Sequence, residues 1–308
     1  MTLAHVDAGE SNWLTLAVLV QYRMATTQQM HRVIAPQARI EQTRRRLATL
    51  RDEGLIDRVL LPQAGRSRVW FATRYGRRVA SQWSELREWQ PAQPVADRTA
   101  ATRRAGHALA VTETAIAFLN DARRRGDEFR PLDWIRDVRH PLGRSKAVIP
   151  HALMYYRNAS ADGADSLLRA FVDVDRATLG PQRLAAKLTA YARLHPCMPA
   201  ALESPRPATG HEPPPHERRQ RHAPFRRLLF VLDNTGPTGI ETRIDALHAA
   251  SRGPALAGFL HTVPVLAASL ADLLPHGPSA PIWRPIQNPD RKVDWMHTPR
   301  PPARGKQR

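Results

Sequence analysis

The sequence is poor in cysteine and lysine, and it shows no sign of a membrane segment. Cys197 is the only cysteine, which excludes an intramolecular disulfide framework and a cysteine-based zinc finger, and fits a reducing cytosol. The first residues, MTLAHVDAGESNW, lack the basic head and apolar run of a signal peptide. The most apolar window, 255–274, is interrupted by His261, Pro264 and Asp272, so we expect a buried or amphipathic helix there. These observations predict a cytoplasmic protein with no membrane partner.

Acidic residues are also few relative to basic ones. The chain has 28 Asp and Glu against 46 Lys and Arg, a formal net charge of +18, and only four of the basic residues are lysines. A bias toward arginine codons explains arginine in place of lysine, but it does not explain the surplus of cations. A polyanion is therefore the expected partner, and double-stranded DNA is the leading candidate. A basic protein without a nucleic-acid role remains the alternative.

The first eighty residues predict three short helices and a β-hairpin. The helices are WLTLAVLVQYRM, TQQMHRVI with Thr26 or Thr27 as its cap, and QARIEQTRRRLATLRDEGLI, which Gly54 ends. Two strands, LIDRVLL and RVWFATR, follow around the turn PQAGRS. This order resembles the winged helix-turn-helix, in which the strand leaving the wing ends in aromatic-x-Thr-x-x-Gly. Phe71, Thr73 and Gly76 occupy those three positions.

The third helix carries the features expected of a recognition helix. Its apolar stripe is Ile40, Leu47 and Leu50, and the opposite face is polar and rich in hydrogen-bond donors. Between residues 31 and 78 there are twelve arginines and four acids, a net +8. Arginine can bond guanine edges and glutamine can bond adenine edges. The predicted DNA-binding residues are Arg39, Gln42, Arg45, Arg46 and Thr49 of the helix, with Arg66 and Arg68 of the wing.

With 308 residues, the chain is long enough for two domains and tails. A linker containing Pro91 and Pro94 precedes a long helix, three strand candidates, a helix, a fourth strand and another helix. We predict an α+β protein: a winged helix-turn-helix followed by a nuclease-like α/β domain with a small central sheet. The predicted parts are a winged helix-turn-helix at 12–82, a linker at 83–99, the nuclease-like domain at 100–252 with a disordered Pro-rich insertion at 197–225, and a C-terminal helix and basic disordered tail at 253–308.

The element order of the second part resembles the PD-(D/E)xK nuclease-like fold. The resemblance implies catalytic positions at Glu113, on the long helix, and at Asp173 and Asp175, on the third strand. His151 stands where the first strand acid would be, and Asp175 stands where a lysine would be. Lys187, on the following helix, could replace that lysine.

Several motifs together resemble the replication-relaxation family of actinobacterial proteins. They are HALAVTE at 107–113, VIPHAL, VDVDRAT and KLTAY at 187–191, in the same order as in that family. The family typically has Pro-Asp where this chain has Pro150-His151. The resemblance implies an accessory role in plasmid or mobile-element replication, relaxation or transfer, with replication or transfer proteins as further partners.

The chemistry of the two aspartates in LLRAFVDVDRATLG is left open by the sequence. Asp173 and Asp175 lie two apart and face the same side of a strand. One hypothesis is a metal site of Glu113, His151 and Asp173, in which Mg²⁺ or Mn²⁺ would support a DNA nickase. The other is that the aspartates pair with nearby arginines such as Arg169 or Arg176, or cap the helix after Thr178. The sequence establishes no cofactor. A winged-helix transcription regulator is an alternative function. The sequence also leaves open whether the protein is a homodimer.

Overall fold

The computed structural model describes residues 10–61, 67–83, 86, 98–143, 146–159, 166–178, 180–197 and 227–298. Four of the predicted features lie wholly or mostly outside these residues. They are Arg66 in the wing turn, most of the linker at 83–99, nearly all of the Pro-rich insertion at 197–225, and the last ten residues of the basic tail.

The N-terminal unit combines helices with a three-stranded antiparallel sheet of order β1-β3-β2. Thr26 caps α2 with a capping box: its hydroxyl accepts the Gln29 N–H, and the Gln29 side chain accepts the Thr26 N–H. At Gly76, an added Cβ would lie 2.0 Å from the carbonyl oxygen of Leu55, so only glycine fits there. The elements are α1 (Glu10–Tyr22), β1 (Ala25–Thr26), α2 (Thr27–Ile34), α3 (Ile40–Asp52), β2 (Ile56–Leu61), β3 (Ser67–Ala72) and α4 (Arg74–Ala80).

A six-stranded mixed sheet forms the centre of the second unit, in the order β11-β10-β9-β8-β7-β4. Strand β7 pairs antiparallel with both β4 and β8, whereas β8, β9 and β10 are mutually parallel and β11 pairs antiparallel with β10. A separate hairpin, β5 and β6, lies against α6. The strands are β4 (Trp134–Arg136), β5 (His140–Leu142), β6 (Lys146–Val148), β7 (Ala152–Asn158), β8 (Ser166–Asp175), β9 (Leu228–Leu232), β10 (Val265–Ser269) and β11 (Arg284–Pro285).

Helices cover both faces of this sheet, and the alternation of side chains along the strands decides which face each residue meets. Val172 and Val174 of β8 face α5, while Phe171 faces the opposite layer. All five residues of β9 are buried, as expected for a strand covered on both sides. The helices are α5 (Arg98–Arg125), α6 (Pro181–Leu194), α8 (Pro237–Ser251), α9 (Ala257–Thr262) and α10 (Leu270–His276), with short 3₁₀ turns at Pro131–Asp133, His195–Cys197 and Pro254–Leu256.

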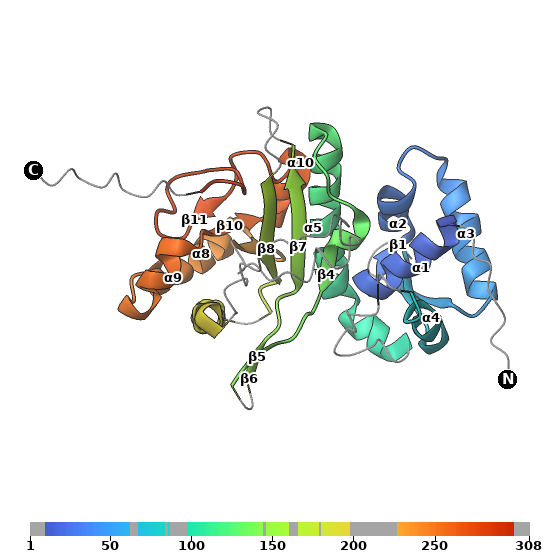
Figure 1. Ribbon diagram of the computed structural model, residues 1–308, viewed down its shortest axis with the longest axis horizontal. Coiled ribbons are helices and arrows are strands. Elements are labelled where there is room, and N and C mark those ends of the chain that lie inside the picture. The colour runs from blue at the N-terminus through green and yellow to red at the C-terminus, as the bar shows by residue number, and fades with distance from the viewer. Residues whose placement is uncertain are drawn as a thin grey trace, which may run out of the picture.

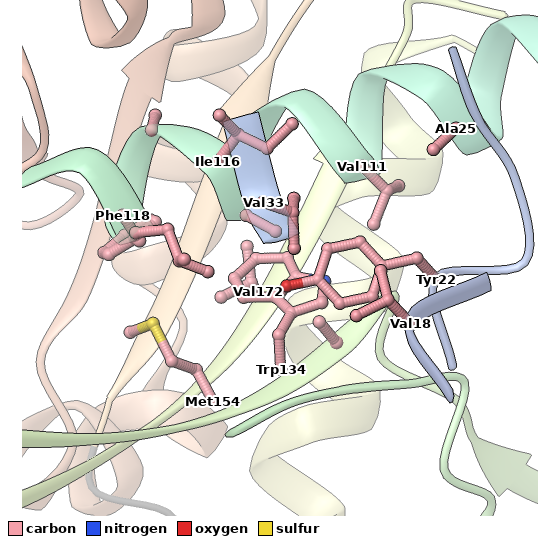
Figure 2. Close-up of a cluster of buried hydrophobic side chains, with 14 of the residues drawn as sticks. Val18, Tyr22, Ala25, Val33, Val111, Ile116, Phe118, Trp134, Met154 and Val172 are labelled. Carbon is pink, nitrogen blue, oxygen red and sulfur yellow. The ribbon is translucent and has the colours of Figure 1, made fainter. Parts of the chain in front are cut away.

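The N-terminal unit and the large sheet share one hydrophobic core. Helix α5 lies between them in Figure 1, and it contacts both α2 and β8. The carbonyl oxygens of Leu132 and Trp134 both accept from the buried side-chain amide of Gln21, at 2.8 and 2.7 Å. Although α5 has 28 residues, neither it nor any other helix in the described part could cross a membrane. Figure 2 shows side chains from both units in this core: Val18, Tyr22, Ala25 and Val33 beside Val111, Ile116, Phe118, Trp134, Met154 and Val172.

The prediction of one helix over 255–274 was wrong, because this window contains α9, strand β10 and the start of α10. Pro264 follows α9, and the next residues form β10, which pairs with β9 and β11 and whose apolar side chains are buried. A fully apolar strand and an apolar helix look alike in sequence. Here Pro264 lies between the end of α9 and the start of the strand. The chain up to residue 298 also packs against the rest, with Trp283 and Trp295 completely buried.

Candidate functional site

A buried carboxylate, Asp173 on β8, is the centre of the candidate site. Only 1% of the residue is exposed, and three side chains surround its carboxylate. Lys187 Nζ contacts Oδ1, Tyr191 donates its hydroxyl to Oδ2 at 2.9 Å, and His151 Nδ1 lies 2.7 Å from Oδ1. Lys187 and Tyr191 are four residues apart on α6, which places both side chains on the face of that helix turned toward β8.

The electrostatics of this cluster keep Asp173 ionised. Burial alone would raise the pKa of Asp173, but His151 and Lys187 outweigh it and hold that pKa well below its ordinary value. Burial, with the Asp173 carboxylate beside it, raises the pKa of Tyr191 well above its usual value. Tyr191 therefore stays protonated and acts as a donor.

Two histidines lie edge to face beside the carboxylate. The rings of His107, on α5, and His151 are 4.3 Å apart between centroids. Burial, assisted by His151, lowers the pKa of His107 to about 3, so it is neutral at physiological pH. His151 Nδ1 faces both the Asp173 carboxylate and the backbone N–H of Val174, at 2.9 Å. A proton on Nδ1 suits the first contact and a lone pair suits the second, so the ring satisfies one of them at a time.

Asp175 is paired elsewhere. Its Oδ2 accepts from Nε of Arg243, on α8, at 2.6 Å. Arg176 pairs with Asp233 at 3.1 Å. The prediction that the two aspartates form ion pairs agrees with these contacts, but the partners are Lys187 and Arg243 rather than the arginines proposed from the sequence.

Glu113 does not reach this cluster. It lies against α2, where it contacts Arg32 and accepts from the side-chain amide of Gln29 at 2.8 Å. On a helix, six residues correspond to a rotation of about 240°, so Glu113 and His107 face different sides of α5. The predicted metal set of Glu113, His151 and Asp173 is therefore not brought together.

The donor set around Asp173 does not fit a divalent metal ion. Mg²⁺ and Mn²⁺ require several free oxygen ligands, whereas the Asp173 oxygens already accept from neighbouring side chains. Within the described residues, no group of three His, Cys, Asp or Glu side chains is arranged to hold a metal ion.

A second candidate surface is the outer face of α3. Thr43, Leu47 and Leu50 are buried, so the opposite face points to solvent. Glu41 is occupied by Arg44 at 3.1 Å. Within the described residues, no carboxylate pairs with Arg39, Arg45 or Arg46, so their charge is available to a ligand. Arg39, Gln42, Arg45 and Thr49 are exposed, and Arg46 is half-buried.

The β2–β3 hairpin adds further cations. Arg68 is exposed and lies opposite Leu60, which is itself 58% exposed. One step along the same face, the guanidinium of Arg58 lies over the Trp70 ring, 5.4 Å from its centre. The hairpin thus presents arginines beside an exposed apolar side chain.

Comparison with known proteins assigns the chain to a family. The family model for replication-relaxation proteins matches residues 16–200, more than half of the 308 residues. The chain belongs to the replication-relaxation family. No curated protein matches it.

Two solved structures, both variants of Lactococcus lactis ZitR, match part of this replication-relaxation protein. Each has 16% identity and a TM-score of 0.23, and covers 27% of this chain and 54% of the ZitR chain. The alignment therefore spans about half of ZitR.

The replication-relaxation match covers α3, the hairpin, Asp173 and the whole of α6. Sequence reasoning did not assign roles to His107 and Tyr191, although both stand in motifs that carried the resemblance. Arg243 also went unassigned, and its distance from Asp175 in the chain left no local signal.

Proposed function

We propose that this replication-relaxation protein is a DNA-binding accessory protein of plasmid or mobile-element replication, relaxation or transfer. Its N-terminal unit would be a winged helix-turn-helix, and its second unit a nuclease-like domain that is catalytically impaired. The family suggests a role in replication or relaxation. The observation that carries the proposal is the exposed face of α3, where arginines without carboxylate partners stand beside glutamine.

The N-terminal geometry supports major-groove binding. Helix α3 follows α2 after a short turn, and the β2–β3 hairpin extends from the same unit (Figure 1). In the proposed complex, Gln42 and Arg45 read base edges while Arg68 of the hairpin holds backbone phosphate. Positive charge on both elements would attract DNA before any base is read.

The strand order supports the nuclease-like assignment. Apart from the β5–β6 hairpin inserted between β4 and β7, the order is helix α5, antiparallel strands β4, β7 and β8, helix α6 and the parallel strand β9, as in the core of PD-(D/E)xK proteins. The acids at the expected place are neutralised by Lys187 and Arg243. A domain of this kind can position DNA or a partner protein without cutting DNA.

Replacing Arg45 by Ala is expected to weaken specific duplex binding by about 1–3 kcal/mol, because it removes a donor pair aimed at a base. The DNA site would first be selected from a random duplex library, and affinity then measured by gel shift at fixed salt. Arg291→Ala, which removes an exposed arginine far from α3 in the sequence, is the charge-matched control. Equal affinity for wild type and Arg45→Ala would refute the placement of the recognition helix.

We expect supercoiled plasmid to stay supercoiled when it is incubated with the protein and Mg²⁺ or Mn²⁺. The reason is that Glu113 is bound to α2 and Lys187 occupies the Asp173 carboxylate. The reaction is analysed on a gel after protease treatment, with Asp173→Ala in parallel. Open-circular product from wild type, absent with Asp173→Ala, would instead establish a nickase, and linear product an endonuclease that cuts both strands.

A further inference from the structure

A pocket of about 570 Å³ opens beside the buried Asp173. Its walls come from β8, from the first half of α6, and from His107 and His151. This volume lies in the range of pockets that hold small molecules or a nucleotide unit.

The carboxylates of the pocket already accept hydrogen bonds from protein side chains, whereas its basic side chains still have free N–H donors. Asp173 accepts from the side chains of α6, and Asp175 accepts from Arg243, which lies outside the lining. Besides the two histidines, two arginines and one lysine line the same space: Arg176, Arg183 and Lys187. An anionic ligand would therefore meet donors without meeting a free carboxylate.

Arg183 and Lys187 provide the donors. They are four residues apart on α6 and face the pocket together. Arg183 is exposed, and no carboxylate in the described part of the chain pairs with it. The Lys187 ammonium has three N–H groups, one of them toward Asp173, and its side chain remains 34% exposed.

We propose that this pocket binds a phosphate group of a nucleic-acid strand through Arg183 and Lys187. Phosphate suits the site because it accepts several charge-assisted hydrogen bonds at once, and a planar guanidinium matches two of its oxygens. The source is either an internal phosphodiester or a terminal phosphate, and both present the same oxygens.

The position of the pocket favours a nucleic-acid strand, a point that rests on the proposed function. Ala101 and Ala105 of α5 pack against the sheet of the β2–β3 hairpin. On the other side of the same stretch, Gly106 approaches the Arg176 guanidinium and His107 lines the pocket. Only the width of one helix, about 10–12 Å, therefore separates the hairpin unit from the pocket.

The test uses a single-stranded tetranucleotide with a 3′ fluorophore, which is too short to form the duplex that α3 would read. Its binding to the full chain is measured by fluorescence anisotropy, with and without a 5′-phosphate on the probe. Arg183→Ala is expected to weaken binding about tenfold, and Arg183→Lys to weaken it less, because lysine keeps the charge but loses the contact with two oxygens. Arg193→Ala, which removes an arginine of the same helix outside the pocket lining, should have little effect.

Equal binding of both probes would assign the site to internal phosphodiesters, and binding of the phosphorylated probe alone would assign it to a terminal phosphate. The proposal is overturned if neither probe binds, or if Arg183→Ala and Arg193→Ala change affinity equally. Unchanged thermal unfolding of Arg183→Ala confirms that the variant is folded. Arg45→Ala should leave tetranucleotide binding unaltered, so a failure of the α3 proposal and a failure of the pocket proposal are distinguishable.

Discussion

A chain that ends at residue 97 is expected to remain unfolded, although it contains every helix and strand of the N-terminal unit. In the full chain, α1 is buried both by its own unit and by β4 and the turn before it. Ending the chain at 97 would expose side chains such as Val18 and Tyr22 on the face that meets α5 and Trp134. Each such side chain contributes about 1.5–3 kcal/mol on burial, so the loss of several is comparable with a typical net stability of about 5–15 kcal/mol.

Circular dichroism and heteronuclear NMR of the 1–97 chain would check this expectation. The control is a chain that ends at residue 298, which lacks only the last ten residues and retains both units. Dispersed amide signals and a cooperative thermal transition for the 1–97 chain would show that the N-terminal unit is an independent domain. In that case the shared core would contribute orientation rather than stability.

Elements with local signals could be predicted from the sequence. Helix α6 runs from Pro181 to Leu194, as its apolar periodicity indicates. Gly54 has a positive φ of 72° at the end of α3, where glycine was expected to end the helix, and Gly126 has the same kind of conformation, φ 74°, after α5. These features depend only on residues within a few positions of one another.

Contacts between distant parts of the chain could not be predicted in the same way. Strand β10 was read as helix because its pairing with β9 and β11 depends on residues far away in the sequence. The partner of Asp175 on α8 was missed for the same reason. Glu113 is different: its angle to His107 on α5 follows from helix geometry and could have excluded a shared site.

Replacing Lys187 by Met is expected to lower the free energy of unfolding by about 2–3 kcal/mol at pH 7. Breaking a buried ion pair costs about 3–5 kcal/mol, and the partial exposure of Lys187 together with the remaining His151 and Tyr191 contacts reduces that figure. Lys146→Met, which makes the same substitution at an exposed position of β6, is the matched control.

The pH dependence of this loss tests its cause. The pKa of Asp173 in the folded wild type lies below its unfolded value, so its contribution to stability is present above about pH 4 and is lost as pH falls. In Lys187→Met, burial acts with less opposition and the pKa of Asp173 rises, so the variant takes up its proton more readily. The difference between wild type and variant should therefore shrink between pH 7 and about pH 3.5 in urea unfolding. If the difference in free energy of unfolding stays constant with pH, Lys187 stabilises the fold through its alkyl chain. In that case, adding Asp173→Asn to Lys187→Met would restore none of the lost stability.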